Sequence, residues 1–238
     1  MASKVGQNIE AGNAAWSFGG SVADTFVDHI RHSVPLYEEG HDLTCQLSDW
    51  FLSPTSTAYE IGTSTGELLK KLALHNAHRV GAKFIGMDVE APMVAKARAH
   101  CADVPSITIL EEDGRNFAFE KADLIISYYT MQFIPPRDRQ QLFDRIYEAL
   151  NWGGAFIMFE KVRAPDARFQ DIAVGLYNEF KLRQGFDEKE IVGKTRSLKG
   201  ILEPFSTEGN FGLMRRAGFE DITTVSKYIC FEGYLAIK

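Results

Sequence analysis

Short apolar runs alternate with helical patterns from residue 57 onward. Nearly continuous apolar runs predict buried strands, whereas apolar residues that recur every three or four positions predict helices. Strands are expected at residues 57–61, 83–87, 107–110, 123–127 and 155–159, and helices at 67–74, 91–100 and 138–150. Strands that alternate with helices pair in parallel, and the helices cover both faces of the sheet. This part of the chain therefore predicts an α/β fold.

The chain after residue 160 changes its pattern. Helical periods are found near 166–184, 187–201 and 206–217, and two strands are expected at 221–228 and 231–237. Two consecutive strands with a short connection pair antiparallel. We therefore expect a seven-stranded, mostly parallel sheet with an antiparallel end.

The first 55 residues lie outside the alternating pattern. Residues 1–20 are polar and end in two glycines, so we expect them to be loosely ordered. Ser21 can cap a first helix. A second helix is expected to run to the Ser53-Pro54 break, and its apolar residues are Leu43, Leu47, Trp50 and Phe51.

The chain shows no internal repeat, low-complexity tract or linker. We therefore predict a flexible segment 1–20 followed by one domain, 21–238, in which 21–55 form an N-terminal helical cap and 161–205 a helical insert. At 238 residues and 45% apolar composition, such a domain can bury one sizeable core without disulfides.

Charge and cysteine usage limit the class of protein. With 26 Lys and Arg against 32 Asp and Glu, the net charge is −6, so we do not expect extended nucleic-acid binding. No apolar run is long enough for a membrane helix, and the first residues lack the apolar core of a signal peptide. The three cysteines are scattered without metal-ligand spacing, which is typical of reduced thiols in a cytoplasmic protein. We expect no bound metal.

The segment from Tyr59 to Glu67 joins the first strand of the alternating region to its helix, and two chemistries fit it poorly. The residues Gly62–Gly66 match the G-x-S-x-G elbow of serine hydrolases, whose histidine follows later in the chain. All six histidines lie at or before His100, which argues against a hydrolase. A dinucleotide site needs three glycines in G-x-G-x-x-G, and two of them are missing here.

A third pattern fits better: an acid, then glycines, then further acids at the ends of the next strands. This pattern is typical of class I enzymes that bind S-adenosylmethionine (SAM). Glu60 would face the amino-acid end of SAM, and Gly62 and Gly66 would let the loop wrap its methionine part. Asp88 ends the second strand and would hold the ribose hydroxyls, and Asp113 follows the third strand near the adenine.

The similarity to known sequences extends well beyond this loop. Over about residues 16–238 the chain resembles the carboxy-SAM synthase family within the class I SAM-dependent methyltransferase superfamily. The stretches that carry the resemblance are Arg31–Tyr37, Tyr59–Ser64, Met131–Pro135, Leu150–Gly154, Glu160-Lys161, Phe180-Lys181, Lys194–Ser197 and Ala217–Phe219. The resemblance implies a Rossmann-like fold and a homodimer that makes carboxy-SAM from SAM and prephenate, a small-molecule reaction in the cytoplasm.

The resemblance also implies roles for single residues. Tyr37 matches a tyrosine of the donor pocket, and Arg196 matches an arginine that holds the extra carboxylate across the dimer. The other matches form the SAM site: Gly62, Thr63 and Ser64 in the loop, Asp88 and Val89 at the ribose, and Asp113 and Gly114 at the adenine.

The chain departs from the family at three positions. Glu60 and Thr63 stand where the family has Asp and Cys, and Tyr128 stands where it has an asparagine near the reacting sulfur. Because Tyr128 changes the floor of the pocket, we expect a methyltransferase for a small, anionic acceptor, with Tyr128, Tyr37 and Arg196 as the catalytic candidates. The alternatives are a carboxy-SAM synthase or a user of carboxy-SAM, and a SAM-binding protein without catalysis.

The insert offers a further candidate surface. Phe169, Ile172, Leu176 and Phe180 recur at helical spacing, which predicts either a buried stripe or a dimer face. Together with Tyr177 they could cover the acceptor site. Glu160, at the end of the fifth strand of the alternating region, could touch the acceptor or cap a helix.

Overall fold

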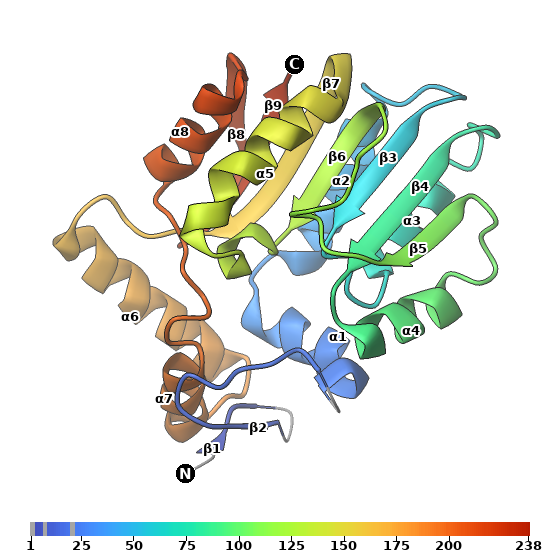
Figure 1. Ribbon diagram of the computed structural model, residues 1–238. Helices are drawn as coiled ribbons and strands as arrows, with labels where there is room; N and C mark the ends of the chain where they lie inside the picture. Colours follow the sequence, from blue (N-terminus) through green and yellow to red (C-terminus); the bar gives the residue numbers. More distant parts are fainter. Residues whose placement is uncertain (1–2, 7–8, 20–21) are drawn as a thin grey trace.

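A seven-stranded sheet forms the centre of the protein in a computed structural model, which describes residues 3–6, 9–19 and 22–238 (Figure 1). The strand order is β5-β4-β3-β6-β7-β9-β8, and only β9 runs antiparallel to both of its neighbours. The predicted fold class is therefore confirmed. The strands are β3 (Thr57–Ile61), β4 (Lys83–Asp88), β5 (Ile107–Glu111), β6 (Ala122–Tyr128), β7 (Leu150–Lys161), β8 (Asp221–Tyr228) and β9 (Phe231–Ile237).

Helices pack on both faces of this sheet. Successive strand side chains point to opposite faces, and accordingly Leu124 and Ile126 belong to one apolar core, whereas Ile125 belongs to the other. The first core includes residues of α2, α3 and α4, and the second includes residues of α5 and α8. The helices are α1 (Val22–Ser33), α2 (Tyr37–Ser48), α3 (Glu67–His75), α4 (Ala91–His100), α5 (Pro136–Ala149), α6 (Ala167–Arg183), α7 (Glu188–Ser197) and α8 (Thr207–Ala217).

Two boundaries differ from the predictions. The α2 helix ends at Ser48, so its expected extension to the Ser53-Pro54 break is wrong, and Trp50 lies beyond the helix with 84% of its surface exposed. The pattern misled because apolar spacing continues past the last helical turn. The β7 strand already begins at Leu150, where a break was expected before Ala155. None of the helices in the described part of the chain is long and apolar enough to span a bilayer.

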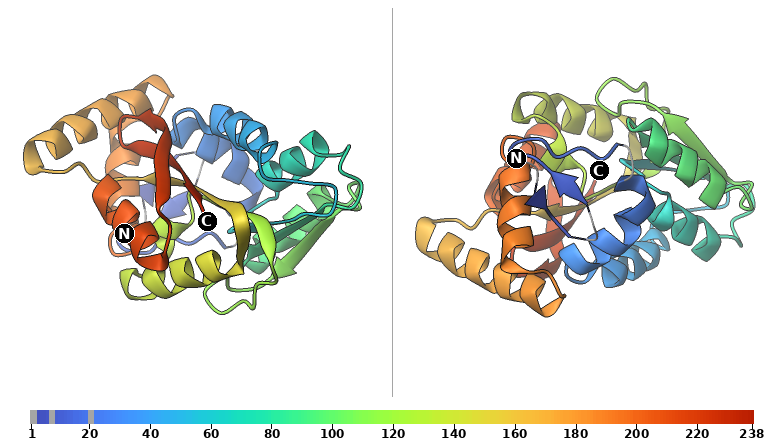
Figure 2. Two further views of the ribbon diagram at one scale, coloured as in Figure 1. Left: turned by 90° about the horizontal axis from the view of Figure 1, so that it is seen from above. Right: turned by 90° about the horizontal axis from the view of Figure 1, so that it is seen from below.

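The N-terminal arm, residues 3–6 and 9–19, is more ordered than its polar sequence indicates. Its strands β1 (Ser3–Lys4) and β2 (Glu10–Ala11) pair antiparallel and contact α7 (Figure 2). The backbone N–H groups of Ala14 and Trp16 donate to carbonyl oxygens near the end of α7. A few apolar residues suffice to dock the arm, namely Val5, Ile9, Ala11 and Trp16, which pack against Leu198 and Ile201. Ser21 lies outside the described residues.

The α6 helix projects from the body of the molecule (Figures 1 and 2). Phe169, Ile172 and Leu176 are each about half exposed, at 55%, 51% and 46%. The interpretation of these residues as a buried stripe is therefore wrong, since no element among the described residues covers them. Their role as a dimer face stays a prediction.

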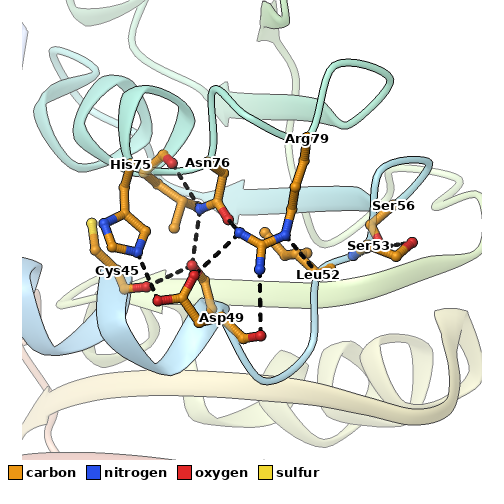
Figure 3. Close-up of polar contacts among 10 residues, drawn as sticks. Cys45, Asp49, Leu52, Ser53, Ser56, His75, Asn76 and Arg79 are labelled. Atoms are coloured by element: carbon orange, nitrogen blue, oxygen red, sulfur yellow. Dashed lines mark hydrogen bonds and ion pairs between the residues drawn. The ribbon is translucent and has the colours of Figure 1, made fainter.

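A group of paired polar side chains joins α2 to α3 at the amino ends of β3 and β4 (Figure 3). We call Ser48, Asp49, His75, Asn76 and Arg79 the base cluster. Asn76 is fully buried and donates to the Ser48 hydroxyl and the Leu72 carbonyl, both at 2.9 Å. Asp49 accepts from Arg79 at 3.1 Å and contacts His75 at 3.0 Å. This cluster fixes the end of the sheet that lies away from the site described next.

Candidate functional site

A cavity of about 760 Å³ opens at the carboxyl ends of the parallel strands. The loops that follow β3, β4, β5 and β6 form one part of its wall, and α1, α6, α7 and the N-terminal arm contribute the rest. Its volume is in the range of small-molecule sites, which in open α/β sheets lie at this edge. Within the described residues, no three His, Cys, Asp or Glu side chains converge on a metal site.

The loop after β3 is fixed against β4. The backbone N–H groups of Gly62 and Thr63 both donate to the Met87 carbonyl, at 2.8 and 2.9 Å. Gly62 has φ +75°, and a Cβ atom there would overlap the Thr130 side chain, so the position requires glycine. Gly62, Thr63 and Ser64 line the cavity. Gly66 does not line it: this residue starts α3 with φ +84° and packs against Cys101.

Asp88 lies at the end of β4 with its carboxylate held by backbone. The N–H groups of Ser64 and Glu90 donate to its two oxygens at 2.9 and 3.0 Å. Each oxygen keeps a lone pair for a further donor, as a ribose diol would require. Asp88 and the neighbouring Val89 both line the cavity, and burial raises the pKa of the Asp88 carboxyl.

Glu60 contributes a buried acid to the same end of the cavity. Its carboxylate accepts a hydrogen bond from the Thr63 hydroxyl at 2.8 Å, and only 3% of its surface is exposed. Burial raises the pKa of Glu60 to about 8. A bound cation would lower this pKa again, because an opposite charge favours the ionised form. The side chain is thus suited to a ligand that carries a positive charge.

Asp113 is held ionised beside the cavity. The Arg115 guanidinium donates to it at 2.6 Å and lowers the pKa of this carboxyl, while another Arg115 nitrogen reaches Asp138 at 3.0 Å. Gly114 lets the same loop approach β3, since a Cβ atom there would lie 2.9 Å from Ile61. Asp113 and Gly114 line the cavity with Glu60 and Asp88, and we call this part the acidic end.

Tyr128 and Tyr37 lie where the acidic end meets the rest of the cavity, and both line it. The Tyr128 hydroxyl donates to the Tyr37 backbone carbonyl at 2.6 Å, which fixes the start of α2. The Tyr37 ring packs against Tyr128 and His41, with centroid distances of 5.3 and 4.5 Å. Burial raises the pKa of both phenols, so both stay protonated at neutral pH and act as hydrogen-bond donors rather than as bases.

Besides Glu190 and Glu203, the segment 161–205 contributes positive side chains to the cavity wall. We call this set the basic end; its members are Lys161, Arg163, Lys181, Lys194 and Lys199. The ammonium groups of Lys161 and Lys181 lie 4.3 and 4.5 Å from the centre of the Tyr177 ring. The sequence analysis assigned no charge role to these lysines. The only signal in the sequence is that Lys161 and Lys181 lie in the stretches Glu160-Lys161 and Phe180-Lys181, which carry the family resemblance.

The N-terminal arm covers part of the basic end. The Trp16 ring lies against the Lys194 ammonium and stacks on His29, with 5.7 Å between ring centroids. Burial, followed by the charge of Lys194, lowers the pKa of His29 to about 3, so this imidazole is neutral at pH 7. Burial, followed by the charge of Lys181, also lowers the pKa of the Lys194 ammonium well below its usual value.

Two candidates from the sequence lie outside the cavity of their own chain. Arg196 is exposed on α7, and its backbone carbonyl accepts from Ala14 of the N-terminal arm. Glu160 is 2% exposed and accepts hydrogen bonds from the backbone of Met131 and Gln132. Glu160 thus caps the turn after β6, the second of its two proposed roles.

Comparison with known proteins finds a matching family model and similar enzymes from other organisms. The family model of a methyltransferase domain matches residues 58–154. The carboxy-S-adenosyl-L-methionine synthase of Staphylococcus epidermidis is 36% identical over 224 residues, which are 94% of this chain and 97% of that protein. The enzyme of the same name from Campylobacter jejuni is 35% identical over 227 residues, and the match covers 94% of each chain.

Solved structures agree on the fold. A putative O-methyltransferase from Nostoc punctiforme superposes with a TM-score of 0.63 at 16% identity, over 92% of this chain and 59% of that one. Human N-acetylserotonin methyltransferase in complex with SAM superposes with a TM-score of 0.56 at 20% identity, over 85% and 55% of the two chains. At such identities the likeness concerns the Rossmann-like architecture.

Proposed function

The chain belongs to the carboxy-S-adenosyl-L-methionine synthase family, and on that premise we propose that it makes carboxy-SAM from SAM and a small organic acid. Membership makes it a SAM-dependent transferase of the class I fold. Which reaction this transferase catalyses is our proposal. It replaces our expectation of a methyltransferase for a small anionic acceptor, because the relatives support the alternative better.

The division of charge within one cavity carries this proposal. The acidic end offers Glu60, Asp88 and Asp113 to a ligand that, like SAM, bears a sulfonium and an ammonium group. The basic end offers lysines from the segment 161–205, which suit a carboxylate. A synthase that transfers a carboxyl group from an organic acid to the methyl carbon of SAM, with release of the remainder of the acid, must hold both substrates. The family resemblance names prephenate as that acid.

Because of Tyr128, methyl transfer is a second candidate reaction. It stands in place of the family's asparagine, close to the expected position of the reacting methyl group. Its hydroxyl, however, is bound to the Tyr37 carbonyl, so it offers no free base to an acceptor. The synthase reaction is therefore the better use of this pocket.

Product analysis tests the choice between the reactions. The purified protein is incubated with SAM and prephenate, and adenosyl products are identified by mass spectrometry. We expect carboxy-SAM from the wild type, and a change of less than about tenfold for Tyr128→Asn. Carboxy-SAM from Tyr128→Asn alone would instead identify Tyr128 as a block to the synthase reaction and favour methyl transfer. SAM that binds but is never consumed would favour the protein without catalysis.

We further propose a cytoplasmic homodimer that forms through α6. Phe169, Ile172 and Leu176 expose an apolar face there, and Arg196 on the neighbouring α7 is free to reach a partner's cavity. Ile172→Glu is expected to shift the mass measured by light scattering from dimer to monomer. Val80→Glu, at a residue 91% exposed and outside α6, is the control that leaves the dimer intact. The three cysteines are free and buried, as suits a reducing compartment.

The Arg196 proposal has its own test. An arginine fork matches a carboxylate better than a lysine does. Arg196→Lys is therefore expected to weaken binding of the acid by about 1.5–3 kcal/mol and to leave SAM affinity unchanged in calorimetry. Unchanged affinity for the acid would show that Arg196 is a solvent-exposed side chain without a role in binding the acid.

A further inference from the structure

We propose that Lys161 and Lys181, held on the ring of Tyr177, form the binding site for a carboxylate of the second substrate and thereby select an organic acid. The inference rests on the proposed function, because it names the residues that would hold that substrate. It concerns side chains that enter the cavity from two different elements, β7 and α6.

The position of the two ammonium groups is fixed by their surroundings. Tyr177 is anchored through its hydroxyl, which donates to the Ser33 carbonyl at 2.8 Å. Both ammonium groups lie within 4.5 Å of the centre of this ring. Lys181 is 6% exposed, and it is the one buried residue of α6, whose other side chains are partly or fully in solvent. The one side chain that α6 buries is therefore charged rather than apolar.

The two charges have no counterion among the described residues. None of the ion pairs in this part of the chain involves Lys161 or Lys181. The groups that face them are the Cys230 thiol, Arg163 and Lys194, of which none is an acid. Burial and the charge of Lys161 lower the pKa of Lys181 to about 8.

Buried charges without a partner are costly, and breaking or omitting a pair destabilises a fold. Two ammonium groups at one aromatic ring add mutual repulsion. A carboxylate bound in this part of the cavity, which both lysines line, would supply the missing charge and accept hydrogen bonds from the ammonium groups. The arrangement is therefore unfavourable in the free protein and favourable with an anionic ligand, as expected of a binding site rather than of a packing device.

The experiment separates these two roles. The full-length protein is saturated with S-adenosylhomocysteine, so that no reaction occurs, and is titrated with prephenate or malonate by calorimetry and thermal unfolding. Wild type is expected to bind prephenate and to gain in melting temperature. Lys161→Met and Lys181→Met are each expected to weaken this binding at least tenfold, with affinity for S-adenosylhomocysteine within twofold of wild type. Lys181→Arg, which keeps the charge, is expected to retain part of the binding.

Lys189→Met is the matched control, because Lys189 is exposed on α7 and outside the cavity. It is expected to behave as wild type. A further readout is the melting temperature without any acid: a packing role predicts a lower value for Lys181→Met, whereas a ligand role predicts an equal or higher one.

Each outcome decides between the claims. Equal affinity of wild type and both methionine variants for prephenate overturns this inference and leaves the synthase proposal standing. Binding of malonate that depends on both lysines, without any carboxy-SAM formed from SAM and prephenate, supports the site and overturns the synthase. If the wild type binds neither acid, the inference is wrong.

Discussion

The base cluster and the cavity wall both contain buried polar side chains, yet they differ in how completely these are paired. In the base cluster, Asn76 makes hydrogen bonds with both of its neighbours from α2 and α3, and Asp49 contacts both Arg79 and His75. In the cavity, Asp88 keeps unused lone pairs, and Lys161 and Lys181 have no counterion among the described residues.

This difference separates stability from binding. A fully paired group contributes to folding and has nothing left to offer a ligand, since its removal leaves its partners unsatisfied. A group that is positioned but only partly paired contributes little to folding and keeps its capacity for a ligand. Substitutions in the two regions should therefore have opposite effects.

The largest effect is expected at Asp88. Asp88→Ala removes two hydrogen bonds from ribose hydroxyls to a charged group, each about 1.5–3 kcal/mol. SAM binding should weaken by about 3–6 kcal/mol in calorimetry. The melting temperature should fall only slightly, through loss of the acceptor for the Ser64 and Glu90 N–H groups. Glu111→Ala is the control, because Glu111 is the exposed partner of Asp88 in the register of β5 and β4. Unchanged SAM affinity would remove Asp88 from the ribose site.

The converse is expected at Asn76 in the base cluster. Asn76→Ala leaves the Ser48 hydroxyl without the amide donor in a buried site, and the Leu72 carbonyl keeps only the backbone N–H of residue 76. The free energy of unfolding should fall by about 2–4 kcal/mol in urea titrations. SAM affinity should not change, and His78→Ala, at an exposed neighbour, should alter neither quantity. Loss of SAM affinity would show that the two regions are coupled.

The pH dependence of stability sharpens the comparison. The pKa of Lys181 is about 8 in the folded protein, against 10.5 in the unfolded chain. Between these values the unfolded state binds more protons, so stability should rise with pH through this window. The contribution of Lys181 is up to about 3 kcal/mol. Urea titrations at pH 7.5 and 9.5 should show the rise in wild type and a smaller one in Lys181→Met; equal rises would contradict the unpaired charge.

The smallest of these effects is the expected pH dependence of SAM affinity near neutral pH. The pKa of Glu60 is about 8, and a cationic ligand favours its ionised form. SAM binding should therefore release a proton, and the affinity should rise about fivefold from pH 7 to pH 8. Calorimetry in buffers of different ionisation enthalpy measures the release. Glu60→Gln should abolish it, and release that persists in this variant would point to another group.

The acidic end could be predicted from the sequence because its chemistry is local. Glu60 and Gly62 lie in one strand and its following loop, and Asp88 and Asp113 follow the next two strands. Parallel strands bring their carboxyl ends to one edge of the sheet, so spacing along the chain translates directly into proximity. The strands themselves were predicted for the same reason, since each is a short apolar run.

The basic end could not be predicted in this way. Lys161 comes from β7, Lys181 from α6 and Lys194 from α7, and no spacing rule relates these elements. A lysine in a polar helix normally indicates a solvated face, and only tertiary packing shows otherwise. The order of the N-terminal arm escaped prediction similarly, because it depends on contacts with α7 rather than on its own pattern.

The docking of the arm on α7 also has a consequence for the order of folding. The arm is synthesised before the whole of the central sheet from β3 to β7, and α7 only after it, so the two can meet only late. The strand-loop-helix contacts at β3 close short loops, whereas this contact closes a very long one, which is entropically costly and slow. A nascent chain should thus acquire its SAM-binding half first, and a complete chamber for chemistry only after α7 has been synthesised.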